Sequence, residues 1–336
     1  MNRPFSRRAL LSAATLLLAL PVLAQSSRPM DKITVAGWSK PITEVTQLLV
    51  EEDKGFFNAN GIELAYVSGS GGGDAIRNIL TGQADVAFTD PGSFFSALDK
   101  GEKLRAIYDI YPQNVFNVVS LKAANIHQPA DLKGKKIGVY SLSSGTRQNL
   151  QVLLHQAGLT ESDVTIVVTG LLNFAPLLQG QVDATAATDT GLLVGKRKGL
   201  GDVNVMEVRD YLNVSSDLFV VREQVYQQKK AVLRRFLNGY RQSAAWMIAN
   251  PDEAAGLAMK RAIDGTDRAI NLDVIRLRNA ASVSVATRTM GLGAFDLDSL
   301  QKAADAYHKL GLIERGIKVS DVVSADLLPS SKSATP

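Results

Sequence analysis

The sequence predicts an α/β fold of two lobes, each with a central, mainly parallel sheet flanked by helices. Two similar segments carry this prediction: residues 80–92 read LTGQADVAFTDPG and residues 178–191 read LQGQVDATAATDTG, with one extra residue in the second. In both, a Gly-Gln-x-Asp turn precedes a short apolar run that ends in Thr-Asp and is followed by Gly, a pattern typical of a strand that turns into a helix. A matched pair of such corners indicates two similar lobes. Their strand ends would face a shared ligand cleft, because open α/β sheets bind ligands at the carboxyl ends of their strands.

The chain is long enough for two lobes once an export signal is set aside. Residues 1–24 begin with a basic head of three arginines, continue as an apolar run over residues 9–20 and end in Val-Leu-Ala, the pattern of a signal peptide cleaved after Ala24. The run is shorter than the roughly 20 residues of a membrane-spanning helix. We expect export to the periplasm by the Sec or the Tat route. About 300 residues then remain, more than one hydrophobic core usually supports.

Composition narrows the functional classes. The chain has no cysteine, so neither a disulfide nor a lipidated cysteine can hold or anchor the mature protein. Its net charge is +4, and removal of the three arginines of residues 1–24 leaves +1, which gives no basis for nucleic-acid binding. The histidines, His127, His155 and His308, are far apart and form no metal-ligand pattern. We expect neither a metal nor a cofactor, and residues 329–336 are typical of a disordered tail.

The first lobe is predicted from residues 31–118 and 218–328. Apolar, β-branched runs indicate its strands, Asn60-Gly61 ends its first helix, and Ser68–Asp74 forms a glycine-rich loop. The expected order is strand 33–37, helix 43–57, strand 62–67, helix 75–80, strand 85–88 and strand 104–110. This alternation is typical of a parallel, doubly wound sheet.

The second lobe is predicted from residues 119–217 and repeats the pattern. A strand at 115–121 carries the chain across, a turn at 131–136 leads into the next strand, and the serines and threonine of residues 141–146 favour the start of a helix that runs to about Ala157. The other expected elements are strands 137–140, 164–168, 184–187 and 203–208 and helix 174–178. A strand at 217–221 brings the chain back to the first lobe.

Long helical segments follow at residues 231–249, 251–262 and 298–310, and Pro251 suits the first position of a helix. We expect them to pack on the first lobe, because the second is already complete. One lobe is then made of two chain segments and the other is inserted between them. The two crossings between the lobes form a hinge with little freedom to twist.

Five motifs, in order along the chain, carry a family resemblance. They are EDKGFF at 52–57 with GIEL at 61–64, GQAD at 82–85, DLKGKKIG at 131–138, GQVD at 180–183 and Asn250-Pro251. With these motifs the sequence resembles the periplasmic solute-binding proteins of ABC importers, in the NMT1/THI5-like or SsuA/TauA-like group that serves alkanesulfonates, taurine, nitrate and the thiamine pyrimidine precursor. The resemblance extends from Ile33 to Val323.

The resemblance implies a type II periplasmic-binding-protein fold that closes around a ligand as a monomer and delivers it to a membrane permease with its ATPase. We expect the ligand to be a small organic solute, an anionic sulfonate or carboxylate that is aromatic or aliphatic. A thiamine pyrimidine precursor or a nitrate-type solute is the alternative. A ligand sensor with the same fold and the soluble binder of a tripartite importer also remain open.

The residues themselves indicate an anion site at Ser143, Ser144, Gly145 and Thr146. A helix begins there, so free backbone N–H groups, hydroxyl donors and the positive end of the helix dipole converge on one point. The alternative is an ordinary serine or threonine cap.

Further ligand contacts are expected on both lobes. Trp38, with Ser39 beside it, ends the first strand and could stack on a planar ligand or pack in the core. In the glycine-rich loop, Ser70 and Gly71 could bring backbone close to the ligand, or the loop could be a plain turn. Two carboxylates, Asp90 and Asp189 with Thr190 next to it, follow the repeated strands and could accept hydrogen bonds from the ligand or cap helices.

An enzyme is not expected. The related pyrimidine synthase of the same fold is associated with a cysteine-rich motif, and this chain contains no cysteine. It also lacks the Gly-x-Ser-x-Gly elbow of acyl-transfer hydrolases. We therefore predict a protein that binds a ligand and leaves it unchanged.

Overall fold

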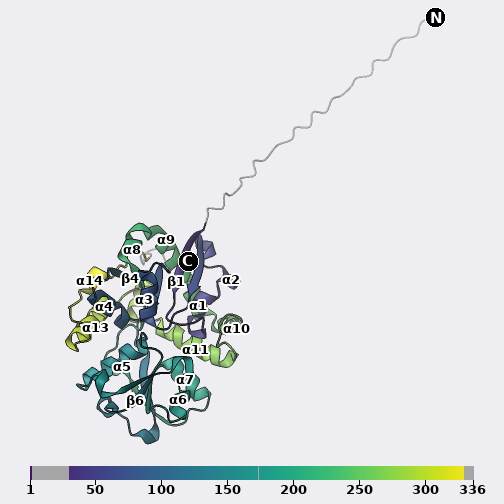
Figure 1. The fold of residues 1–336 in the computed structure, drawn as a ribbon. Helices are drawn as coiled ribbons and strands as arrows, with labels where there is room; N and C mark the ends of the chain where they lie inside the picture. Colours follow the sequence, from purple (N-terminus) through teal and green to yellow (C-terminus); the bar gives the residue numbers. More distant parts are fainter. Residues whose placement is uncertain (2–29, 173, 329–336) are drawn as a thin grey trace.

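The computed structural model describes Met1 and residues 30–172 and 174–328, which form two lobes with a sheet in each (Figure 1). The export signal predicted at residues 1–24 and the tail predicted at 329–336 lie outside the described residues, apart from Met1. Among the described residues, no helix combines the length and the apolar character needed to cross a membrane.

The two sheets have the same construction. The first contains β1 (Asp31–Ala36), β2 (Ile62–Val67), β3 (Val86–Thr89), β4 (Leu104–Tyr111) and β10 (Asp217–Arg222) in the order β2-β1-β3-β10-β4. The second contains β5 (Phe116–Leu121), β6 (Lys136–Val139), β7 (Thr165–Val168), β8 (Ala184–Thr188) and β9 (Val203–Glu207) in the order β7-β6-β8-β5-β9. In each sheet only the strand that follows a lobe crossing, β10 or β5, runs antiparallel to its neighbours. The predicted pair of mainly parallel lobes is confirmed.

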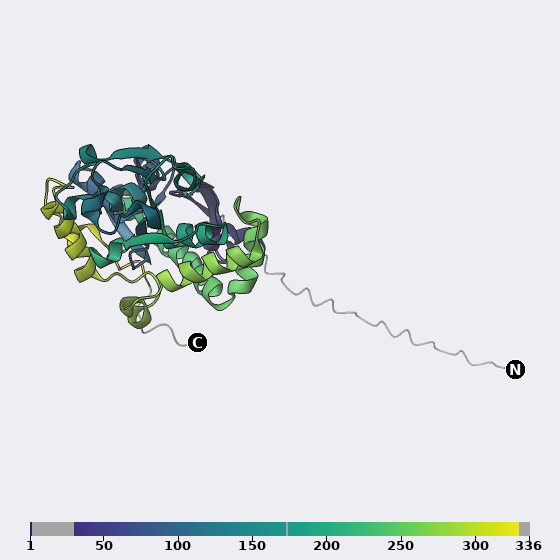
Figure 2. The ribbon, with the colours of Figure 1, turned by 90° about the horizontal axis from the view of Figure 1, so that it is seen from below.

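Helices cover both sheets. Lobe I carries α3 (Gly72–Leu80), α4 (Pro91–Asp99), α8 (Glu223–Gln228), α9 (Lys230–Ala249), α10 (Pro251–Arg261), α12 (Val285–Met290), α13 (Leu297–Lys309) and α14 (Val319–Val322), and lobe II carries α5 (Gly145–Gln156), α6 (Ala175–Leu178) and α7 (Asp189–Arg197). One further helix, α11 (Arg268–Ala281), packs against α10 and against α7, so it links the two lobes. Figure 1 shows α11 at the level between the sheets, and the view from below in Figure 2 shows it alongside α7.

The structure differs from the predicted elements in several places, one of which is α11, a helix that is not predicted from the sequence. The helix expected at 43–57 is divided into a 3-10 turn (Thr43–Val45), α1 (Thr46–Leu49), α2 (Glu51–Lys54) and a second 3-10 turn (Asn58–Asn60). Thr46 donates its hydroxyl to the Thr43 carbonyl at 2.7 Å, a local bond that competes with helical pairing. The lobe boundaries also shift, because β5 of the second sheet starts at Phe116, ahead of residue 119, and Asp217 already belongs to β10 of the first sheet.

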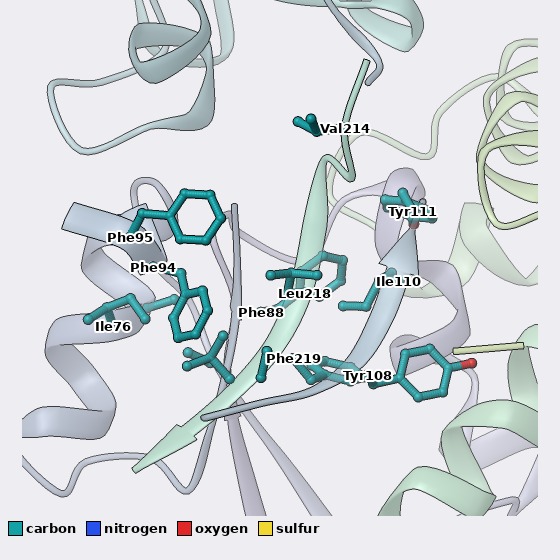
Figure 3. Close-up of a cluster of buried hydrophobic side chains, with 14 of the residues drawn as sticks. Ile76, Phe88, Phe94, Phe95, Tyr108, Ile110, Tyr111, Val214, Leu218 and Phe219 are labelled. Atoms are coloured by element: carbon teal, nitrogen blue, oxygen red, sulfur yellow. The ribbon is translucent and has the colours of Figure 1, made fainter. Parts of the chain in front are cut away.

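An aromatic core fixes the first sheet on its helices. Phe219 of β10 is fully buried, and its ring lies 4.6 Å from that of Tyr240, 5.3 Å from that of Phe236 and 5.6 Å from that of Phe88, measured between centroids. Figure 3 shows Phe219 and Leu218 on β10 between Tyr108 of β4 and the side chains from α3 and α4. Burial of these rings holds β10, the returning hinge strand, in the centre of lobe I.

Candidate functional site

Two crossings, at residues 112–115 and 211–216, connect the lobes and are bonded to each other. The N–H of Ser216 donates to the carbonyl of Tyr111 at 2.8 Å. The side-chain amide of Asn114 in the first crossing donates to a backbone carbonyl of the second at 3.1 Å. Paired crossings favour bending over twisting, so the lobes can open and close as two bodies about this hinge.

A cavity of about 170 Å³ lies between the lobes beside the hinge. Since an engineered cavity of about 150 Å³ holds a benzene molecule, this volume suits a single ring with small substituents. The cavity is lined by Trp38, Ile42, Glu44, Gly71, Gly72, Asp90, Val115, Phe116, Tyr140, Ser144, Gly145, Thr146, Leu171, Ala187, Thr188, Thr190, Gly191, Val194, Lys198, Asp217, Asp264, Val274 and Arg278. Both lobes therefore contribute to its wall.

An aromatic pair forms one wall of the cavity. Trp38 follows β1 of lobe I, and Tyr140 follows β6, the corresponding strand of lobe II. Their ring centroids lie 6.3 Å apart with the planes at 87°, and Trp38 makes a second edge contact, with Phe88 at 6.5 Å. Within the described residues, the buried indole N–H of Trp38 has no hydrogen-bond partner. The two rings, with their planes nearly perpendicular, therefore form an apolar corner of the cavity.

The lobes touch at the rim, through the glycine-rich loop and the start of α5. Ser70 accepts hydrogen bonds at its carbonyl from the hydroxyls of Ser141 and of Ser143, the latter at 3.0 Å. The N–H of Gly73 donates to the Ser143 carbonyl at 2.9 Å. Gly71 lies against the same segment with φ at +132°, a backbone conformation that is unfavourable for other residues. The structure is thus in a closed arrangement.

Gly71→Ala is expected to keep the lobes apart, because a Cβ at this position would lie 2.4 Å from the Ser143 carbonyl oxygen. We expect a larger radius of gyration of the unliganded protein in solution scattering. Gly82→Ala is the matched control: φ is +77° there, and no described atom lies within 4 Å of the added carbon. An unchanged radius in Gly71→Ala would mean that the rim contact does not hold the closed form.

The start of α5 is used differently from the prediction. Ser144 caps the helix, and its hydroxyl donates to the Ser141 carbonyl at 2.7 Å. The same hydroxyl oxygen accepts a hydrogen bond from the Thr146 hydroxyl at 2.8 Å, because its single hydrogen is already donated. Thr146 accepts from the N–H of Tyr140 at 3.1 Å. Both predicted hydroxyls are therefore bonded within the protein. Gly145 and Thr146 still line the cavity, and the first N–H groups of a helix have no carbonyl partner inside it.

The two repeated corners are offset by one residue. Asp90 is the N-cap of α4 and accepts from the N–H and from the hydroxyl of Ser93, both at 2.8 Å. In the second corner Thr188 is the N-cap of α7, and Asp189 is the first helical residue. Both aspartates directly follow their strands as expected, but they differ at the helix start, because the extra residue of the second copy moves Asp189 past the cap. Asp90 lines the cavity, whereas Asp189 bonds Arg278.

Arg278 is the most buried charged group of the site. It projects from α11 of lobe I with only 1 % of the residue exposed, and its guanidinium forms an ion pair with Asp189 of lobe II. Glu44 lies 3.8 Å away, and the ring centroid of Tyr111 is 5.1 Å from the guanidinium carbon. This interlobe pair lies at the cavity and adds a third connection to the two crossings. Arg197 of α7 and Asp273 of α11 form a second, more exposed pair along the same contact.

Carboxyls dominate the charge of the cavity wall. Glu44, Asp90, Asp217 and Asp264 face it, against the cations Lys198 and Arg278. Burial raises the pKa of Glu44 and of Asp90. For Asp217, burial and the nearby carboxyls of Asp90 and Glu44 raise the pKa well above its usual range. An acid-rich wall of this kind favours ligands that donate hydrogen bonds.

Behind the hinge, Asp109 of β4 is a buried acid whose proton affects stability. Burial raises its pKa to about 8, and it accepts a hydrogen bond from the Ser215 hydroxyl at 2.7 Å. The folded protein then keeps a proton that the unfolded chain loses near pH 4, so stability falls as pH rises from about 4 to about 8. We expect Asp109→Asn to flatten this dependence in thermal melts, and exposed Asp298→Asn to leave it unchanged. If stability changed with pH equally in Asp109→Asn and in the unmodified protein, the proton of Asp109 would not be the cause.

The structure brings most of the predicted site residues together. Lining the cavity are Trp38, Gly71, Asp90, Ser144, Gly145, Thr146 and Thr190. Ser39 is buried beside it and donates to the Lys40 carbonyl at 2.7 Å, while Ser70 and Ser143 form the rim contact. Sequence reasoning missed Glu44, Tyr140, Asp217 and Arg278. Tyr140 could have been found from the duplication, since it follows the strand that corresponds to the one before Trp38.

Comparisons with known proteins agree with this architecture. Residues 42–254 match the family model described as NMT1/THI5 like. The chain is 23 % identical over 313 residues to the riboflavin-binding protein RibY of Chloroflexus aurantiacus, with 91 % of this chain and 89 % of the relative covered. It is 21 % identical over 238 residues to the 4-amino-5-hydroxymethyl-2-methylpyrimidine phosphate synthase THI5 of Saccharomyces cerevisiae, with 67 % and 69 % covered.

Among solved structures, the periplasmic aliphatic sulphonate binding protein SsuA of Escherichia coli superimposes with a TM-score of 0.62 at 16 % identity, covering 87 % of this chain and 97 % of that one. At this identity the likeness shows the fold. The fold is that of the periplasmic binding proteins.

Proposed function

Because the chain belongs to the NMT1/THI5-like family, we propose that it is the solute-binding component of an ABC importer, which captures a small solute between its lobes and delivers it to a permease and its ATPase. The closed cavity at a two-crossing hinge supports this function. The predicted signal at residues 1–24 would place the mature protein in the periplasm.

The ligand we propose is a single-ring nitrogen heterocycle of the pyrimidine class. The observation that carries this choice is the wall of the cavity, where the aromatic rings of Trp38 and Tyr140 adjoin the buried carboxyls of Asp90 and Asp217. A ligand ring can stack on one of these two aromatic side chains and meet the edge of the other, and carboxyls accept hydrogen bonds from ring N–H and amino groups. The volume of about 170 Å³ suits one ring better than the three fused rings of a flavin.

A sulfonate or carboxylate, the ligand expected from the sequence, is the second candidate. It is favoured by the N-terminus of α5, where Gly145 and Thr146 line the cavity. An anion there would meet Asp90, whose Cβ lies 3.3 Å from the position of a Cβ on Gly145. It would also compete with Asp189 for Arg278, the buried cation of the cavity wall. Both effects disfavour a second negative charge.

A ligand screen tests this proposal. Purified mature protein is titrated calorimetrically with 4-aminopyrimidine, riboflavin, an alkanesulfonate and benzoate, and the melting temperature is measured with each at saturation. A ligand that binds only the folded state raises that temperature. We expect 4-aminopyrimidine to bind most tightly and the anions weakly. A tight sulfonate with no heterocycle binding would establish the second candidate, and an absence of binding by all four probes would refute the proposed ligand class.

Binding without chemical change separates this function from that of the enzyme relatives. We propose no catalysis, since no covalent step is needed to explain closure around a ligand. Mass spectrometry of the ligand recovered after long incubation with the protein checks this. Recovery of the intact molecule is expected, and a new product that depends on the protein would show an enzyme.

Copurification with the permease distinguishes a transport component from a sensor of the same fold.

A further inference from the structure

Asp217 differs from the other carboxyls of the cavity. Asp90 is bonded by Ser93, Asp264 accepts from the backbone and the hydroxyl of Thr43, and Glu44 lies 3.8 Å from Arg278. Asp217 lines the same cavity with 7 % of its surface exposed, yet within residues 30–172 and 174–328 no hydrogen bond or ion pair reaches its carboxyl. A buried carboxyl without a hydrogen-bond partner destabilises the folded protein, and a ligand that forms hydrogen bonds with it removes this cost.

The surroundings of Asp217 favour a proton on its carboxyl. The charged groups that act on it are the carboxyls of Asp90, Glu44 and Asp109, and all three raise its pKa in addition to burial. Of the two cations on the cavity wall, the buried one, Arg278, is paired with Asp189. A protonated carboxyl presents one O–H donor and one carbonyl acceptor side by side.

We propose that Asp217 is the specificity-determining residue of the site and that it recognises an aminopyrimidine edge, a ring nitrogen next to an exocyclic amino group. The carboxyl O–H donates to the ring nitrogen, and its carbonyl oxygen accepts from the amino N–H, which gives two coplanar hydrogen bonds. This inference rests on the proposed function and narrows its ligand class. A sulfonate offers no donor for this carbonyl oxygen.

The position of Asp217 also links recognition to closure. It is the first residue of β10, directly after the second crossing, and it is paired with Tyr111 at the end of β4. Ser216 next to it bonds the Tyr111 carbonyl. A ligand bound to Asp217 therefore contacts the hinge itself. The opposite edge of the ligand ring can then be contacted by residues of lobe II.

The test compares two probes on three variants by calorimetry. The probes are 4-aminopyrimidine and pyrimidine, which differ only in the amino group. Asp217→Leu removes donor and acceptor at similar volume, and Asp217→Asn keeps one of each, as a protonated carboxyl does. Asp298→Asn is the control, an exposed acid that is absent from the cavity wall. Melting curves establish that each variant is folded.

We expect the unmodified protein and Asp298→Asn to prefer 4-aminopyrimidine over pyrimidine by about tenfold or more. Asp217→Leu should abolish the preference and retain pyrimidine binding, while Asp217→Asn should preserve it. A preference that survives in Asp217→Leu, or is lost in Asp217→Asn, overturns the role of Asp217 even when the heterocycle binds. If neither probe binds the unmodified protein, the proposed ligand class fails and this inference fails with it.

Discussion

Arg278→Ala is expected to lower the free energy of unfolding by about 3 kcal/mol, because removal of one partner of a buried ion pair leaves the other charge uncompensated. The side chain of Arg278 is 1 % exposed and that of Asp189 is 28 % exposed. Partial access of water to Asp189 places the expected cost at the low end of the range for such pairs. Denaturant unfolding followed by circular dichroism measures it.

The effect should be specific to the interlobe pair. Arg276, two residues earlier on the same helix, is exposed, and no ion pair of the described residues includes it. We expect Arg276→Ala to change the free energy of unfolding by less than about 0.5 kcal/mol. Similar losses in the two variants would mean that α11 responds to any shortened side chain, and the pair with Asp189 would then have no special role.

Phe219→Ala is expected to cost about 3–5 kcal/mol, the usual range when a buried aromatic side chain is truncated and leaves a cavity. The ring is fully buried in the centre of the first sheet, in edge contact with Phe88, Phe236 and Tyr240. The neighbouring rings cannot easily move into the space left by the Phe219 ring, because they are held on β3 and α9. The same unfolding measurement applies, with near-ultraviolet circular dichroism to report on the aromatic cluster.

Val285 provides the comparison for Phe219, since it is 78 % exposed at the start of α12. Val285→Ala should leave stability within about 0.5 kcal/mol of the unmodified protein. A loss below about 1 kcal/mol in Phe219→Ala would contradict the description of lobe I as a sheet held by this aromatic core.

The repeated corners made the fold predictable. A short apolar run followed by a turn into a helix is a local pattern, and its duplication at 80–92 and 178–191 identified two similar sheets. The structure places both runs as central strands, β3 and β8, at the same position of their sheets. The one-residue offset that moves Asp189 past the cap is not visible in the pattern, because either Thr188 or Asp189 is a suitable cap.

The site was only partly predictable, because its charged residues lie on elements without a strong pattern. Helix α11 buries Asn271, Arg278 and Asn279 along with Val274 and Ile275, so its buried face does not read as apolar in the sequence. An isolated arginine is usually exposed. Asp217 was recognised only as the start of a returning strand. Its place in the cavity depends on the hinge, which is set by contacts distant in sequence.

The central claim is that one small, unaltered heterocycle is held between the two lobes. A crystal structure of the protein with 4-aminopyrimidine tests it most directly. We predict density for one intact molecule, stacked on Trp38 with its amino edge at Asp217, between closed lobes. Density for the ligand on an outer surface, or for a chemically altered product in the cavity, would contradict the account.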